Sequence, residues 1–174
     1  MSPSKLPLLF LLLSLPLLSW ASSYVDPVTR LSFTLPAGWK VRPARLDGLR
    51  VLRVIPPKPD QRERAAIEVT VVDRPQKRGD APDRLARRFR QADDDREAAA
   101  FVRANPKTGR VVTEYREGSF VSGGLWIVRH NLHVFQPMPG KRIIEARCAA
   151  NASEFKTYRR QMESICLSVN EVHK

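Results

Sequence analysis

Two histidines in the interior of the sequence, His130 and His133, are the first candidates for chemistry, because imidazole can act as a general base or bind a metal ion. Both lie in a stretch of alternating residues that is typical of a β-strand. Residues three apart on a strand point to opposite faces, so the two rings cannot bind one metal ion side by side. We expect His130, which alternates with Val128 and Leu132, to be a core histidine and His133 to lie on a polar surface.

Three further motifs could carry chemistry, but each has a structural interpretation. Asp93-Asp94-Asp95 falls in a segment predicted to be helical, where the carboxylates would fan outward as a solvated face and would not converge on a cation. Ser122-Gly123-Gly124 lacks the surroundings of a nucleophile elbow. Asn151-Ala152-Ser153 has the spacing of a glycosylation acceptor, but its asparagine is better explained as a helix cap. The sequence therefore predicts no catalytic residue, cofactor site or metal site.

The chain has two cysteines, Cys148 and Cys166, and we expect them to form a disulfide. They lie outside the predicted export signal, and an exported protein meets an oxidising compartment. The alternative is a pair of buried free thiols. No Cys-x-x-Cys spacing is present, so a redox-active pair is not expected.

The first residues have the three parts of a secretory signal. Lys5 gives a positive start, residues 6–18 are almost wholly apolar, and small residues precede a cut after Ala21. A cut after Ser23 is the alternative. The apolar run is shorter than the roughly 20 residues of a membrane-spanning helix, although an uncleaved anchor is the competing interpretation. We expect residues 1–21 to be removed, leaving a periplasmic or extracellular protein with no transmembrane span.

The charge is strongly positive: 30 Lys and Arg face 18 Asp and Glu, for a net charge of +12. Such an excess favours anionic partners. Export makes nucleic acid an unexpected partner, so an anionic envelope component or an acidic protein is the expected one. The densest cluster, on the first predicted helix, is a possible anion-binding surface: Arg84, Arg87, Arg88 and Arg90. Basic residues of the adjoining loops could extend it: Lys58, Arg62, Arg64, Lys77 and Arg78. The alternative is that arginine only keeps the protein soluble.

The elements that would position these residues follow from hydrophobic periodicity and turn residues. Strands are predicted at residues 31–35, 49–55, 66–73, 110–117, 125–135 and 142–149, the last three as a meander. A helix is predicted from Asp80 to about Ala104, ending before Pro106 and Gly109. A second helix is predicted to begin at Asn151, with Glu154 completing a capping-box-like start. One domain is expected over residues 24–170, followed by a tail at 171–174.

The opening of this domain resembles the PsbP-like superfamily, which includes PsbP, Mog and DcrB-type envelope proteins. The resemblance is carried by Asp26-Pro27 and by the segment from Leu31 to Trp39, which reads Leu-Ser-Phe-Thr-Leu-Pro-Ala-Gly-Trp. It covers most of residues 24–170 in layout. It implies an α+β fold, a three-layer α/β/α sandwich with a mainly antiparallel sheet. It implies no catalytic residue, because the superfamily is largely one of binding and assembly proteins.

These observations give three functional hypotheses. The first is an exported, non-enzymatic binding or accessory protein of the cell envelope, acting on a protein or an anionic component. The second is an immunity or chaperone-like protein that caps a toxin or effector. The third is a hydrolase whose site is assembled from residues distant in the sequence.

Overall fold

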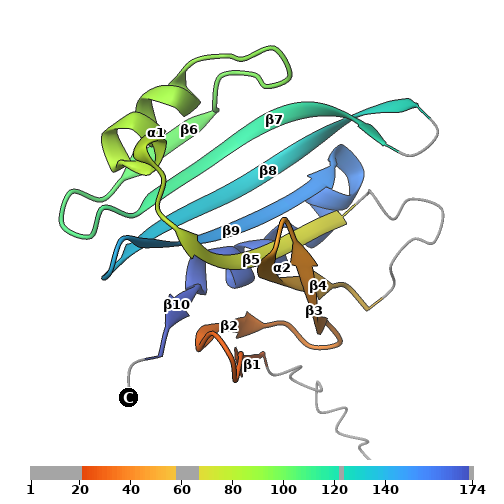
Figure 1. Cartoon of the computed structure of the whole chain (residues 1–174). Coiled ribbons are helices and arrows are strands. Elements are labelled where there is room, and N and C mark those ends of the chain that lie inside the picture. The colour runs from red at the N-terminus through yellow and green to blue at the C-terminus, as the bar shows by residue number, and fades with distance from the viewer. Residues whose placement is uncertain (1–20, 58–66, 122–123, 173–174) are drawn as a thin grey trace, which may run out of the picture.

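A seven-stranded antiparallel sheet forms the centre of the molecule (Figure 1). The computed structural model describes residues 21–57, 67–121 and 124–172. The strand order is β3-β4-β5-β9-β8-β7-β6. These strands span Lys40–Leu46 (β3), Leu49–Ile55 (β4), Ile67–Pro75 (β5), Phe101–Ala104 (β6), Val111–Val121 (β7), Leu125–Met138 (β8) and Arg142–Asn151 (β9).

A separate three-stranded sheet, ordered β1-β2-β10, lies beside the large one. Its strands are Ser22–Val25 (β1), Leu31–Leu35 (β2) and Asn170–Glu171 (β10). Asp26, which follows β1, is fully buried and forms an ion pair with Arg50 of β4 at 2.8 Å. Burial opposes ionisation of Asp26, but hydrogen bonds from Arg50 and Thr29 outweigh it and lower its pKa to about 2. This carboxylate therefore ties the small sheet to the large one.

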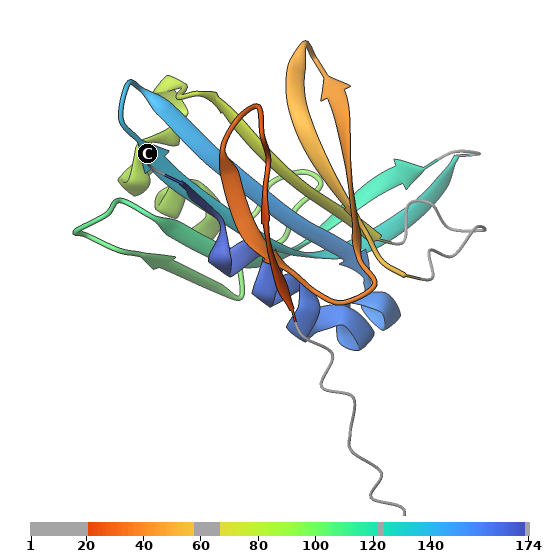
Figure 2. The same cartoon turned by 90° about the horizontal axis from the view of Figure 1, so that it is seen from below.

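Helices cover opposite faces of the large sheet, so the predicted three-layer arrangement is confirmed (Figure 2). Helix α2, Ala152–Ser168, packs Met162 and Ile165 against Leu132 and Val134 of β8. Helix α1, Pro82–Arg90, packs on the other face. Its Leu85 and Phe89 meet three aromatic or aliphatic side chains of the sheet: Tyr115, Phe135 and Ile143. A short 3₁₀ turn, Arg78–Asp80, leads into α1.

The six predicted strands are all confirmed, and the second matches β4 at both ends. The start of the last helix is also confirmed, because the side chain of Asn151 accepts a hydrogen bond from the Glu154 backbone N–H at 2.9 Å. Four strands were not predicted: β1, β3, β6 and β10. Three of them have few residues, and β3 carries only a weak alternating pattern.

The first helix was predicted too long: α1 ends at Arg90, and the expected continuation to Ala104 is wrong. Residues after Gln91 pair instead with the outer edge of β7. Glu97 donates a backbone hydrogen bond to the Arg116 carbonyl, and Ala100 donates one to the Glu114 carbonyl. The edge of β7 would otherwise leave unpaired backbone groups, and pairing it outweighs helix propensity. Asp93-Asp94-Asp95 is therefore outside the helix, and all three side chains are exposed as expected.

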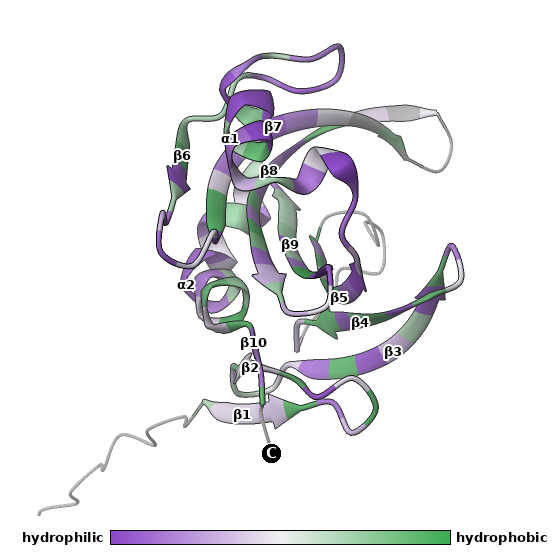
Figure 3. Cartoon of the chain, turned by 60° about the vertical axis from the view of Figure 1, so that its left-hand side comes forward, coloured by the Kyte–Doolittle hydropathy of each residue, from purple (hydrophilic) through white to green (hydrophobic). Residues whose placement is uncertain are grey.

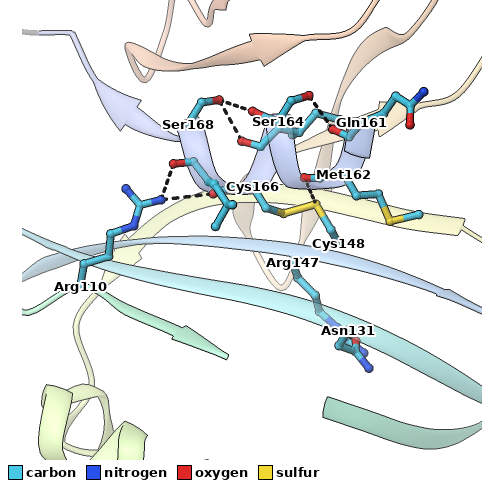
Figure 4. Close-up of a disulfide and its surroundings, with 11 residues drawn as sticks. Arg110, Asn131, Arg147, Cys148, Gln161, Met162, Ser164, Cys166 and Ser168 are labelled. Carbon is cyan, nitrogen blue, oxygen red and sulfur yellow. Dashed lines mark hydrogen bonds between the residues drawn. A yellow bond between two sulfur atoms is a disulfide. The ribbon is translucent and has the colours of Figure 1, made fainter. Parts of the chain in front are cut away.

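Cys148 of β9 and Cys166 of α2 are joined by a disulfide, as the sequence predicts, with their Cα atoms 6.4 Å apart (Figure 4). Both residues are fully buried. The end of α2 is held from the sheet as well, because Arg110 donates hydrogen bonds to the carbonyls of Cys166 and Leu167. A cation at this end also interacts favourably with the helix dipole.

Candidate functional site

The predicted arginine cluster lines a surface hollow of about 390 Å³ beside α1. Arg84, Arg87 and Arg88 lie at spacings of three and four, which place them on one stripe of the helix. Arg90, the fourth arginine of the predicted cluster, does not line this hollow. We call this feature the arginine hollow, and its lining residues are Arg84, Arg87, Arg88, Gln91, Ala92, Asp93 and Arg96.

The arginines of α1 form no ion pair within the described parts of the chain, and this holds for all four: Arg84, Arg87, Arg88 and Arg90. The one carboxylate that lines the hollow, Asp93, lies 4.0 Å from Arg96. Guanidinium groups present planar sets of N–H donors that match carboxylate and phosphate oxygens. The hollow can therefore bind an anionic group.

Arg96 was not predicted as a site residue, yet it lines the hollow. Its guanidinium donates hydrogen bonds to the carbonyls of Arg88, Phe89 and Glu97. It also lies 5.0 Å from the centre of the Phe89 ring and 5.7 Å from that of Tyr115. The first two carbonyls belong to the last turn of α1, so Arg96 closes the helix and holds residues 91–97 against it.

Replacing Arg96 with Ala should lower the free energy of unfolding by about 2 kcal/mol. The hydrogen bond to the Arg88 carbonyl, at 3.0 Å, contributes about 1 kcal/mol, and the two cation–π contacts contribute about 0.5 kcal/mol each. The hydrogen bonds to the carbonyls of Phe89 and Glu97, at 3.4 and 3.2 Å, are longer and add little. Urea unfolding followed by circular dichroism measures it. Arg103, exposed on β6, provides the control, and Arg103→Ala should change stability by less than 0.5 kcal/mol, roughly the limit for surface substitutions. Equal effects of the two substitutions would show that Arg96 does not support the hollow.

The basic loops that were expected to extend this surface are only partly visible. Lys58, Arg62 and Arg64 lie outside the described residues. Lys77 and Arg78 are exposed just before α1, and the Arg78 carbonyl accepts a hydrogen bond from Arg84 at 3.5 Å. Arg78 therefore adjoins the hollow.

A chain of polar side chains runs across the sheet beneath α1. Tyr115 Oη lies 3.0 Å from His133 Nδ1, and His133 Nε2 lies 2.8 Å from Glu145 Oε1. Glu145 in turn accepts a hydrogen bond from Arg74 at 2.6 Å. Arg74 also donates two hydrogen bonds to Asp80, at 2.6 and 3.2 Å. These residues come from β7, β8, β9, β5 and the 3₁₀ turn.

The expected surface position of His133 is wrong, because α1 covers that face of the sheet. His133 is 6% exposed, and its neighbours Arg129 and Asn131 are 8% and 0% exposed. The alternation of residues along β8 indicated that these polar residues share one face of the sheet. It could not indicate that helix α1 covers that face. The expectation for His130 is nearer the structure: its ring is half-buried, 5.3 Å from the Phe155 ring of α2.

The pKa values of Glu145, His133 and Tyr115 favour a single arrangement of protons in this network of polar side chains. Burial raises the pKa of Glu145, but hydrogen bonds from His133 and Arg74 outweigh it and lower that pKa to about 2. Burial lowers the pKa of His133 and raises that of Tyr115. An ionised Glu145 can only accept, so a neutral His133 carries its proton on Nε2 and accepts from Tyr115 through Nδ1.

This network of polar side chains has the residue types of a catalytic relay, but a substrate cannot reach it. Its histidine and tyrosine are 6% and 4% exposed, so neither presents a reactive atom to a substrate. We therefore take this network as the support of α1, which carries the arginines.

Within the described residues, no group of three or more His, Cys, Asp or Glu side chains could hold a metal ion. No helix in the described part of the chain is long and apolar enough to cross a membrane.

Comparison with known proteins identifies the fold. No family model matches the sequence, and no curated protein matches it. Among solved structures, cyanobacterial PsbP (CyanoP) from Synechocystis sp. PCC 6803 is similar, with a TM-score of 0.53 and 16% identity, over 88% of this chain and 94% of that one. LpqN of Mycobacterium tuberculosis, described as involved in cell envelope biogenesis, has a TM-score of 0.50 and 9% identity, over 88% of this chain and 86% of that one. The protein therefore has the PsbP-like fold.

Proposed function

We propose that this protein is an exported, non-enzymatic accessory protein of the cell envelope, and that the arginine hollow binds an anionic envelope component. The observation that carries the proposal is the hollow itself, which Arg84, Arg87 and Arg88 line together and where none of the three forms an ion pair with another described residue. The PsbP-like fold and its presence in an envelope-biogenesis protein support an accessory role. The buried disulfide between Cys148 and Cys166 supports an oxidising compartment.

The protein should sediment with phosphatidylglycerol vesicles but not with neutral phosphatidylcholine vesicles. Binding should weaken strongly between 0.1 M and 1 M salt, because the Debye length falls from about 10 Å to about 3 Å. Cosedimentation at the two salt concentrations measures this. Binding to both lipids alike, or binding that salt does not change, would contradict an anion-binding surface.

The same proposal sets the start of the mature chain. Strand β1 begins at Ser22, and Ser22 and Ser23 pair with Leu35 and Thr34 of β2. A cut after Ala21 leaves β1 intact, whereas a cut after Ser23 removes two of its four residues. The intact mass of the exported protein should therefore correspond to a chain that starts at Ser22. A mass corresponding to a start at Met1 would refute signal cleavage.

A further inference from the structure

A second hollow lies next to the arginine hollow and has the opposite character. It has a volume of about 300 Å³ and shares Ala92, Asp93 and Arg96 with the first. Apolar side chains of the β7–β8 ribbon form part of its wall, and Trp126 and Val128 are each 45% exposed. We call it the tryptophan hollow.

The apolar surface continues from this hollow along the ribbon. Phe120, 71% exposed, meets the Trp126 ring edge to face with the ring centres 4.9 Å apart. Trp126 is seated on Gly118: a Cβ atom at Gly118 would lie only 1.9 Å from its ring. The absence of a side chain at Gly118 thus fixes where the indole lies. Large exposed aromatic groups that adjoin one another typically mark an interaction surface.

Carboxylates supply the charge at this surface. Arg116, which also lines the hollow, forms an ion pair with Glu97, and Glu117 forms one with Arg147. Asp94 and Asp95 line the same hollow, and no ion pair within the described residues includes either of them. Near the indole, the uncompensated charge is therefore negative, on a chain whose net charge is +12.

We propose that the tryptophan hollow docks a basic segment of a partner protein, with a Lys or Arg side chain over Trp126 and between the carboxylates of Asp94 and Asp95. An indole face attracts a cation, and the two carboxylates complement the same charge. A second copy of this chain is the less suitable occupant, because two molecules of net charge +12 repel each other. This surface adjoins the arginine hollow, but the docking of a basic segment does not depend on the anion-binding function proposed there.

A tetramethylrhodamine-labelled hexapeptide of alternating Arg and Leu tests the proposal by fluorescence anisotropy with the exported protein. The peptide should bind, and an uncharged Ser–Leu hexapeptide with the same label should bind at least tenfold more weakly. The double substitution Asp94→Asn, Asp95→Asn should weaken binding at least tenfold. The matched control Asp47→Asn, Asp83→Asn removes the same charge from exposed positions elsewhere and should leave binding within twofold.

Gly118→Ala is the second variant, because it displaces the Trp126 ring without changing any charge. It should also weaken peptide binding at least fivefold, while circular dichroism shows a folded protein. Equal affinity of the parent and the Asp94→Asn, Asp95→Asn protein would overturn the proposal, as would the absence of peptide binding. So would self-association that these substitutions abolish, because the occupant would then be a second copy. Vesicle binding through the arginine hollow is measured separately, so failure of one proposal does not imply failure of the other.

Discussion

Replacing Arg74 with Met should lower the free energy of unfolding by about 3–5 kcal/mol at pH 7, because it leaves the buried carboxylate of Asp80 and the partly buried carboxylate of Glu145 without their cation. The Arg74 side chain is 11% exposed and holds Asp80 and Glu145, each at 2.6 Å. Met keeps the apolar stem of the side chain, so the decrease in the free energy of unfolding is due mainly to the loss of the guanidinium charge. Urea unfolding at pH 7 measures the difference.

The cost of Arg74→Met should shrink in acid. In the parent protein the folded-state pKa of Glu145 is about 2 and that of Asp80 is lowered, so both carboxylates stabilise the fold above the unfolded pKa of about 4. That stabilisation is lost as the pH falls from about 5 to 2. Without Arg74, both carboxylates lose a partner that lowers their pKa values, so less stability remains to be lost in acid. The two proteins should therefore converge between pH 5 and pH 2.

Arg159 gives a matched control, because it also pairs with two carboxylates, Glu114 and Glu163, but its side chain is 49% exposed. Arg159→Met should cost at most about 1 kcal/mol. If Arg74→Met and Arg159→Met lower the free energy of unfolding equally, the network of polar side chains beneath α1 does not stabilise the fold.

Removing the disulfide with the double substitution Cys148→Ala, Cys166→Ala should cost about 3 kcal/mol. The two residues are separated by 18 positions, and a closed loop of this length restricts the unfolded chain by about that free energy. Guanidinium unfolding of the parent and the variant measures the cost.

Reduction provides the control for this prediction. A reducing agent should lower the unfolding midpoint of the parent protein and leave that of the double alanine variant unchanged. If both cysteines of the exported parent react with an alkylating agent under non-reducing, denaturing conditions, the disulfide does not form in the cell.

The parts of the fold that could be predicted were those where local pattern and tertiary environment agree. Strand β4 has five apolar residues around Arg50 and Arg53 and is followed by Pro56, and both of its ends were predicted. The Asn151 cap is set by residues three positions apart. The end of α1 could not be predicted, because the edge of β7 that pairs with residues 95–100 lies far along the sequence.

Only the part of the candidate site that lies on one helix could be predicted from the sequence. Arg84, Arg87, Arg88 and Arg90 were predicted because they lie within two turns of one helix, and the first three of them line the hollow. Arg96 joins the same hollow through a turn that no periodicity indicates. Trp126 is on a distant strand, and only the folded sheet brings it beside Asp94. Figure 3 shows how strongly the sheet curves between β7 and β3, which no sequence pattern specifies.

The most direct test of the anion-binding account is the affinity for phosphatidylglycerol vesicles of two variants that remove equal charge. One is Arg84→Gln, Arg87→Gln, Arg88→Gln, which empties the arginine hollow of its α1 cations. The other is Arg90→Gln, Arg103→Gln, Arg160→Gln, at exposed positions that do not line it. Each arginine at an anionic surface contributes about 1 kcal/mol, so the first variant should bind at least tenfold more weakly than the second. Equal affinity of the two variants would contradict the account and would leave the net charge alone as the cause of binding.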